Sequence, residues 1–169
     1  MSSDYYDYIE DRGAKLYAAQ QARGVQYDQV PGSGGGTEQR TKADISAARA
    51  GRHIKYDMAA ELKASGKTKR QLLLCDYLFN DSIKLALEED WFDLKKKDNV
   101  KLLRRYCCLA IEEMAAPQEF TSLAARARFL GIHPKTFIRN HLKCYSQVYQ
   151  IMDDWALVQF EGMVRKVVC

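Results

Sequence analysis

The stretch FTSLAARARFLGIHPKTFIRNHLKCY (Phe120–Tyr145) decides the fold class. Thr121 is predicted to cap a short helix ending at Leu130, because a threonine hydroxyl accepts hydrogen bonds from the free amides at a helix start. Gly131 suits the tight turn that follows, since glycine adopts positive φ without strain. Pro134 fits the first position of a second helix, where its missing N–H costs no hydrogen bond. The stretch therefore predicts two helices joined by a short turn.

This pair of helices resembles the helix-turn-helix of DNA-binding proteins. With Leu123 as the first motif position, the small residue needed where the helices touch is Ala127 at the fifth position, and the turn residue is Gly131 at the ninth. The apolar anchors at the eighth, tenth and fifteenth positions are Leu130, Ile132 and Phe137. The resemblance implies that the second helix enters the major groove of double-stranded DNA.

Two positions depart from the family pattern. Arg126 stands at the fourth position and Asn140 at the eighteenth, where the family usually places apolar residues. A helical hairpin that serves only as scaffold can carry the same Leu-Gly-Ile turn. DNA binding and a purely structural hairpin therefore both remain open on the residues alone.

The resemblance also predicts which side chains meet DNA. Arginine pairs with guanine and asparagine with adenine through two hydrogen bonds each. The residues expected to contact base edges are Lys135, Arg139, Asn140 and Lys143. Phosphate contacts set the register of a protein on DNA without reading its sequence. The residues expected to make them are Lys95, Lys96, Lys97, Arg126, Arg128 and Thr136.

The distribution of charge agrees with such a partner. The formal net charge is only +4. Residues 95–143, however, carry 11 Lys and Arg against 4 Asp and Glu, so positive charge is concentrated around the candidate motif. A basic surface of this kind attracts nucleic acid, although a solvated helical face has the same composition.

The rest of the chain is predicted to be helical, which makes the fold class all-α: a helical bundle with a C-terminal helix-turn-helix and a long final helix. No segment alternates apolar and polar residues as a strand does. Further helices are predicted over residues 3–22, 38–50, 55–64, 68–90 and 99–115. The final helix extends from Pro134 towards Val164, and we expect Trp155 and Phe160 to anchor it on the core.

A glycine-rich segment predicts the domain organisation. Residues 23–37 contain Gly24, Pro31 and the run GSGGG, which is linker chemistry. We expect an N-terminal helical arm at 1–22, a linker at 23–37 and a helical body at 38–169. Self-association through the arm or through the final helix is one expectation for the oligomeric state.

Cysteine usage and hydropathy indicate the compartment. The five cysteines form no C-x-x-C pair, and the N-terminus lacks an apolar signal segment, which together favour a reducing cytoplasm. No apolar run approaches the roughly 20 residues that span a bilayer, so no membrane association is expected.

Catalytic and metal-binding motifs are weak. Cys107, Cys108, His141 and Cys144 are the best candidate metal ligands, but buried free thiols and a solvated histidine explain the same residues. We predict no metal and no other cofactor. The three histidines form no recognisable arrangement with a nucleophile, and we predict no enzymatic activity.

The order of parts resembles bacteriophage late-gene regulators, namely the Q-type antiterminators and the sigma-like late activators. They too combine a helical body with a C-terminal DNA-binding module. The resemblance implies a transcription regulator that binds near a late promoter in the host cytoplasm and acts with RNA polymerase. The zinc-binding cysteine pairs of some antiterminators are missing from this sequence.

Two other classes of function remain open. A small-terminase-like DNA packaging subunit also carries a helix-turn-helix, but usually near its N-terminus. A helical protein-interaction module that does not bind DNA would instead use Trp155, Phe160 and the tyrosine-rich arm as contacts.

Overall fold

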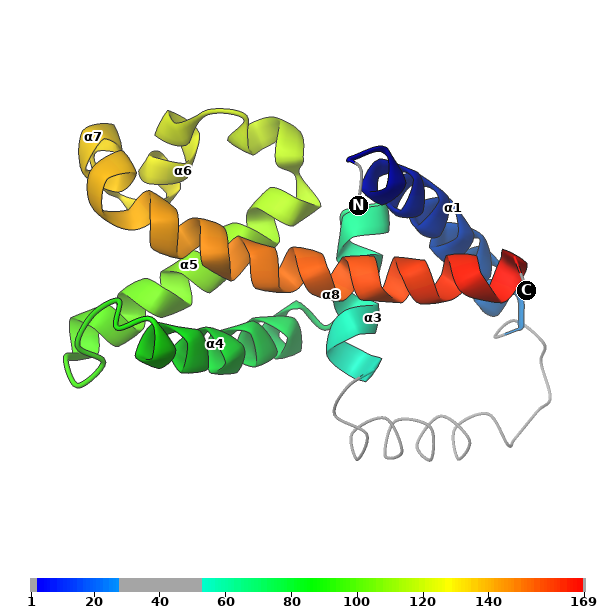
Figure 1. Ribbon diagram of the computed structural model, residues 1–169, viewed down its shortest axis with the longest axis horizontal. Helices are drawn as coiled ribbons and strands as arrows, with labels where there is room; N and C mark the ends of the chain where they lie inside the picture. Colours follow the sequence, from blue (N-terminus) through cyan, green and yellow to red (C-terminus); the bar gives the residue numbers. More distant parts are fainter. Residues whose placement is uncertain (1–2, 28–52, 169) are drawn as a thin grey trace. The chain divides into compact units, whose positions relative to one another are not determined.

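The computed structural model describes residues 3–27 and 53–168 of the chain, and this part is all-α, with no strand (Figure 1). Every described helix is too short or too polar to span a lipid bilayer. The elements are α1 (Ser3–Tyr27), α3 (His53–Ser65), α4 (Gln71–Glu88), α5 (Lys97–Ala115), the 3-10 turn η1 (Pro117–Phe120), α6 (Leu123–Leu130), α7 (Pro134–Thr136), the π-helical turn η2 (Phe137–His141) and α8 (Leu142–Val168).

The chain forms two units. Of the described residues, unit 1 comprises 3–27, 53–65 and 155–168, and unit 2 comprises 66–154. The predicted N-terminal arm, residues 1–22, corresponds to most of α1, which belongs to the same unit as α3 and the end of α8. The predicted helix at 38–50 lies outside the described residues. Of the predicted linker at 23–37, the structure describes residues 23–27, which are helical and continue α1. Gly24 does not end that helix, because one interior glycine costs only about 1 kcal/mol.

Unit 1 is held by close packing between α1 and the end of α8. A Cβ atom added to Gly13 would lie 2.2 Å from the Cβ of Phe160, so only glycine allows this approach. Tyr17 is buried beside Phe160 and donates a hydrogen bond of 2.7 Å to Asp57 on α3. Trp155 and Phe160 are both buried, which confirms their predicted role as anchors of the final helix.

Unit 2 is built on α4 and α5, which pack antiparallel, and it carries the helix-turn-helix segment. Gln71 near the start of α4 contacts Glu112 near the end of α5, and Ser82 further along α4 contacts Cys107. Asn80 and Asp81, residue types that favour caps and turns, lie inside α4 and do not interrupt it. The largest fully buried side chains of the unit come from α4, α5, α6, η2 and α8: Leu74, Leu78, Leu103, Tyr106, Leu109, Ile111, Leu130, Phe137 and Met152.

Candidate nucleic-acid interface

The first helix of the predicted motif is α6, and its cap differs from the prediction. Ser122, not Thr121, is the N-cap: its hydroxyl accepts a hydrogen bond of 3.1 Å from the Ala125 amide. A cap residue needs an extended backbone. Ser122 has φ −114° and ψ 148°, whereas Thr121 is in the right-handed helical region at the end of η1.

The turn between the helices is as predicted. Gly131 has φ +65°, a left-handed conformation that glycine adopts without strain. Its amide and that of Ile132 both bond back to the Ala127 carbonyl, which closes the end of α6. His133 then caps the next helix by accepting from the Lys135 amide at 3.3 Å, and Pro134 takes the first helical position.

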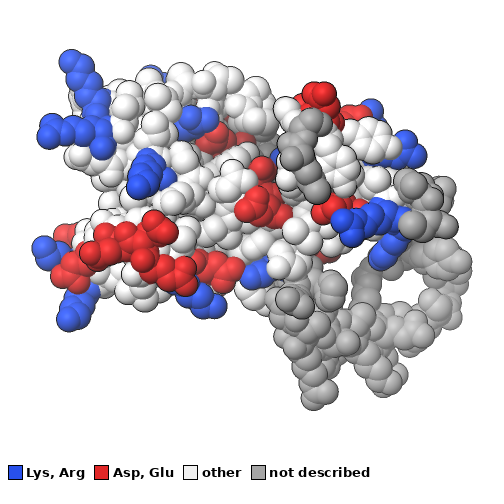
Figure 2. All heavy atoms as spheres, viewed as in Figure 1, with Lys and Arg blue, Asp and Glu red and all other residues white. Residues whose placement is uncertain are grey.

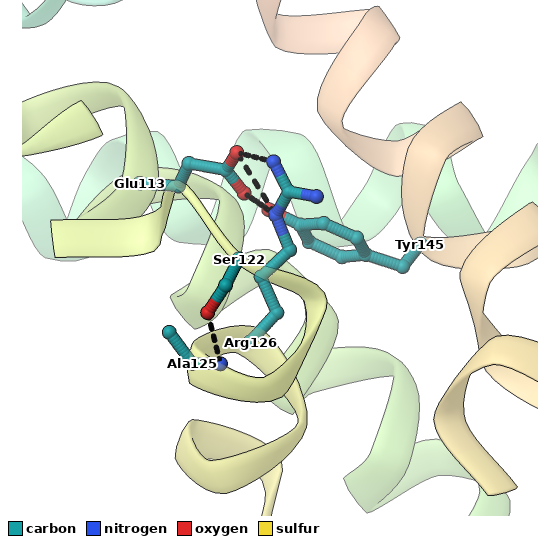
Figure 3. A network of polar contacts seen from close by, with 5 residues as sticks. All are labelled: Glu113, Ser122, Ala125, Arg126 and Tyr145. Atoms are coloured by element: carbon teal, nitrogen blue, oxygen red, sulfur yellow. Dashed lines mark hydrogen bonds and ion pairs between the residues drawn. The ribbon is translucent and has the colours of Figure 1, made fainter. Parts of the chain in front are cut away.

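The inner side of the motif contains an ion pair that the sequence did not predict (Figure 3). The Arg126 guanidinium donates to both carboxylate oxygens of Glu113 on α5, with Nη2 2.5 Å from Oε1 and Nε 3.0 Å from Oε2. Tyr145 on α8 donates its hydroxyl hydrogen bond to the same carboxylate. The Glu113 side chain is only 11% exposed. Three elements of unit 2 thus meet at one buried carboxylate.

This ion pair gives Arg126, one of the predicted phosphate contacts, a partner within the protein. Hydrogen bonding to Glu113 raises the pKa of Arg126, and its guanidinium fork is already used within the protein. Burial, followed by the bond to Glu113, raises the pKa of Tyr145, so the phenol stays protonated and donates. The Arg126 guanidinium therefore binds Glu113 in this structure, which leaves it less available to a phosphate than an exposed arginine would be. Arg126 can occupy the fourth motif position, where the family usually has an apolar residue, because Glu113 pairs with its charge there.

The π-helical turn explains the second departure from the family pattern. Residues eight apart on an α-helix lie about 80° apart around its axis. A π-turn adds one residue to a helical turn, and η2 thereby brings Phe137 and Tyr145 to the same buried side, with ring centroids 6.1 Å apart. Asn140 is then exposed, and the half-buried His141 lies on the inner side.

His141 is held by α5. Its Nδ1 lies 2.6 Å from the hydroxyl oxygen of Tyr106, and burial lowers the pKa of the imidazole. The candidate metal ligands do not gather around it: the described residues contain no group of three or more side chains suited to a metal ion. Cys107 instead lies buried, within hydrogen-bonding distance of Ser82.

The other predicted DNA contacts in residues 120–145 are exposed, and we call the surface that they form the outer side of the motif. Those that the structure exposes are Arg128, Lys135, Thr136, Arg139, Asn140 and Lys143. The sequence from 120 to 145 contains no Asp or Glu to oppose this charge. In Figure 2, basic side chains gather at the end of unit 2 that carries α6 and α7, whereas acidic side chains lie over α4.

The remaining predicted phosphate contacts lie apart from the turn. Lys95 and Lys96 are exposed in the turn before α5, where their backbone amides bond to Asp93, and Lys97 begins that helix. Lys97 and Arg105 are eight residues apart on α5, a rise of about 12 Å.

A basic row on α5 connects this region to the motif. Lys97, Lys101 and Arg105 are exposed and follow one another at a spacing of four residues, so they lie along one side of the helix. Arg105 donates a hydrogen bond to the Leu130 carbonyl at the end of α6. Lys101 and Arg105 were not among the predicted site residues. Their spacing of four residues from Lys97 in a predicted helix was the signal that could have identified them.

Comparison with protein-family models, curated proteins and solved structures finds no match to this chain.

Proposed function

We propose that residues 120–145 bind double-stranded DNA, with the helix that begins at Pro134 entering the major groove. The observation that carries this proposal is the outer side of that helix, which exposes Lys135, Arg139, Asn140 and Lys143 beside a turn free of carboxylates. Long basic side chains and an amide early in such a helix match the hydrogen-bonding groups of base edges.

The second set of contacts in the proposal is to phosphates. Arg128 and Thr136 flank the turn and are exposed. The row formed by Lys97, Lys101 and Arg105 extends the positive surface along α5 and, together with Lys95 and Lys96, supplies charge for the DNA backbone. Arg126 is left out because Glu113 already binds its guanidinium.

The wider role we propose is transcription regulation with RNA polymerase as the protein partner. This step rests on the resemblance in layout to phage late-gene regulators, and it is tested separately from DNA binding. A protein of this kind would hold a promoter-proximal site with residues 120–145 and present its other surfaces to polymerase.

The test is selection of bound fragments from a random pool of duplex DNA by the full-length protein. We expect a short motif to be enriched and the logarithm of its binding constant to fall linearly with the logarithm of salt concentration. The slope should be about −4.5 to −5.4 if five or six phosphates are neutralised. Absence of both enrichment and salt-dependent retention would mean that the hairpin is scaffold. Failure of polymerase to assemble on an enriched site would reject only the wider role.

A further inference from the structure

One apolar side chain lies among the charged and polar residues on the outer side of the motif. Ile138 is the fifth residue of the helix that begins at Pro134, and it is 50% exposed. The residue before it, Phe137, is fully buried. A single exposed isoleucine is ordinary on a protein surface. What matters is the position of this one in the helix.

Ile138 lies beside two residues that are proposed to contact base edges. Lys135 precedes it by three residues, Arg139 follows it directly, and all three are exposed. Residues three or four apart are neighbours on the surface of a helix, so Ile138 and Arg139 both adjoin Lys135. The π-helical turn begins only at Phe137, so it changes these relations little. The aliphatic side chain is therefore flanked by positive charge on the surface proposed to face DNA.

The flanking residues indicate the chemistry of the group that covers Ile138. A protein or membrane contact that relies on apolar area uses a contiguous patch on the order of several hundred Å². The exposed residues around Ile138 on this helix are instead Lys135, Arg139, Asn140 and Lys143. The major groove of DNA combines hydrogen-bonding groups for such residues with one apolar group, the C5-methyl of thymine. The charge and the hydropathy of this helix surface thus match the same partner.

We propose that Ile138 contacts the C5-methyl group of a thymine in the major groove and is a specificity-determining residue of the DNA interface. This inference rests on the proposed function and adds to it an apolar contact that the basic residues do not supply. Thymine is the only standard base of DNA that presents a methyl group in the major groove. Contact with Ile138 removes that methyl and part of the isoleucine from water, which favours a T·A pair at this position.

The place of this thymine in the site follows from the chain. The Cα atoms of Ile138 and Arg139 are consecutive and therefore about 3.8 Å apart. One base-pair step along DNA is about 3.4 Å. Arginine pairs with guanine through two hydrogen bonds. We therefore expect the thymine within about two base pairs of the guanine that Arg139 contacts, on either strand.

The test uses the duplex selected by the full-length protein, with each thymine of its motif replaced singly by deoxyuridine. Uracil keeps the hydrogen-bonding groups of thymine and lacks only the methyl. Fluorescence anisotropy should show that one replacement weakens binding of the wild type about fourfold, the effect of leaving about one methyl group in water. Replacements elsewhere in the motif should change binding less.

The Ile138→Ala variant assigns this effect to the side chain. It should bind the thymine duplex about fourfold more weakly than the wild type does, and the same deoxyuridine replacement should then change its binding by a factor of about one. The matched control is Val158→Ala in α8, which truncates another aliphatic side chain of similar exposure, 53%. Val158→Ala should keep the fourfold preference for thymine. Circular dichroism checks that both variants are folded.

The outcomes separate this inference from the function on which it rests. If no duplex is selected or retained, the proposed function fails and this inference fails with it. If a duplex is selected and retained with the expected salt dependence, two results overturn this inference alone. The first is equal binding of the thymine and deoxyuridine duplexes at every position of the motif. The second is a preference for thymine that persists unchanged in Ile138→Ala.

Discussion

The two sides of the helix that begins at Pro134 differ in burial and in the partners of their side chains. On the inner side, Phe137 and Tyr145 are buried, and Tyr145 shares the Glu113 carboxylate with Arg126. On the outer side, Lys135 and Arg139 are exposed. The first turns of this helix thus separate groups that hold unit 2 together from groups left available to a partner. Substitutions on the two sides should therefore change different measurable quantities.

The largest expected effect is on the inner side, at Phe137. Phe137→Ala should lower the free energy of unfolding by about 3–5 kcal/mol, because the removed ring leaves a cavity between the helices. The matched control is the next residue, Ile138, which is 50% exposed. Ile138→Ala should change stability by about 0.5 kcal/mol or less. Urea denaturation measures both, and equal losses would show that the two sides are not separated at this point.

The ion pair comes next. Arg126→Ala removes three hydrogen bonds from the Glu113 carboxylate, and we expect a loss of about 2–3 kcal/mol in unfolding free energy. Adding Glu113→Gln to that variant should recover part of the loss, because the unpaired buried charge is gone. Arg128→Ala, two residues away and exposed, is the control and should stay within about 0.5 kcal/mol. A loss for Arg128→Ala as large as for Arg126→Ala would contradict the inward assignment.

The outer side should affect DNA binding instead, if the proposed function holds. Arg139→Ala should weaken binding to the selected site by about 1–3 kcal/mol and leave unfolding unchanged. Arg128→Ala should weaken binding to all sequences alike, because a phosphate contact carries no sequence information. Lys84→Ala on α4 is a control for loss of one exposed positive charge. Fluorescence anisotropy with specific and scrambled duplexes distinguishes the three variants.

The turn of the motif was predictable because its requirements are local. Gly131 and Pro134 are each selected by the backbone conformation of a single position, which the residue type reveals. The buried anchors Phe137, Trp155 and Phe160 were likewise predictable from apolar spacing. The exchange of Thr121 for Ser122 as the cap lies within the one- or two-residue uncertainty of any helix boundary.

What escaped prediction depends on groups far apart in the sequence. The inward orientation of Arg126 requires Glu113 from α5 and Tyr145 from α8. No local pattern identifies that pairing. The π-turn is different, because it left a signal: Phe137 and Tyr145 are eight residues apart, whereas residues on one face of an α-helix recur after seven. That extra residue also accounts for the exposure of Asn140.

The smallest expected effect concerns pH and lies on the inner side, at the half-buried His141. Burial lowers its pKa in the folded protein below the usual value of 6.5, while the unfolded chain keeps that value. As pH falls through 6.5 the unfolded state binds the proton first, so stability should decrease until the folded-state pKa is reached. One such group changes stability by at most about 1.4 kcal/mol per pH unit, and by less here because the ring is partly solvated.

The measurement is urea denaturation at pH values between 5 and 8, comparing the wild type with His141→Gln. Glutamine keeps a polar group that can bond to the Tyr106 hydroxyl but does not titrate. The difference in unfolding free energy between the two proteins should therefore shift in favour of the variant below pH 6.5 and stay constant above it. A difference that does not change with pH would place His141 with the outer, solvated side of the helix rather than with the inner side.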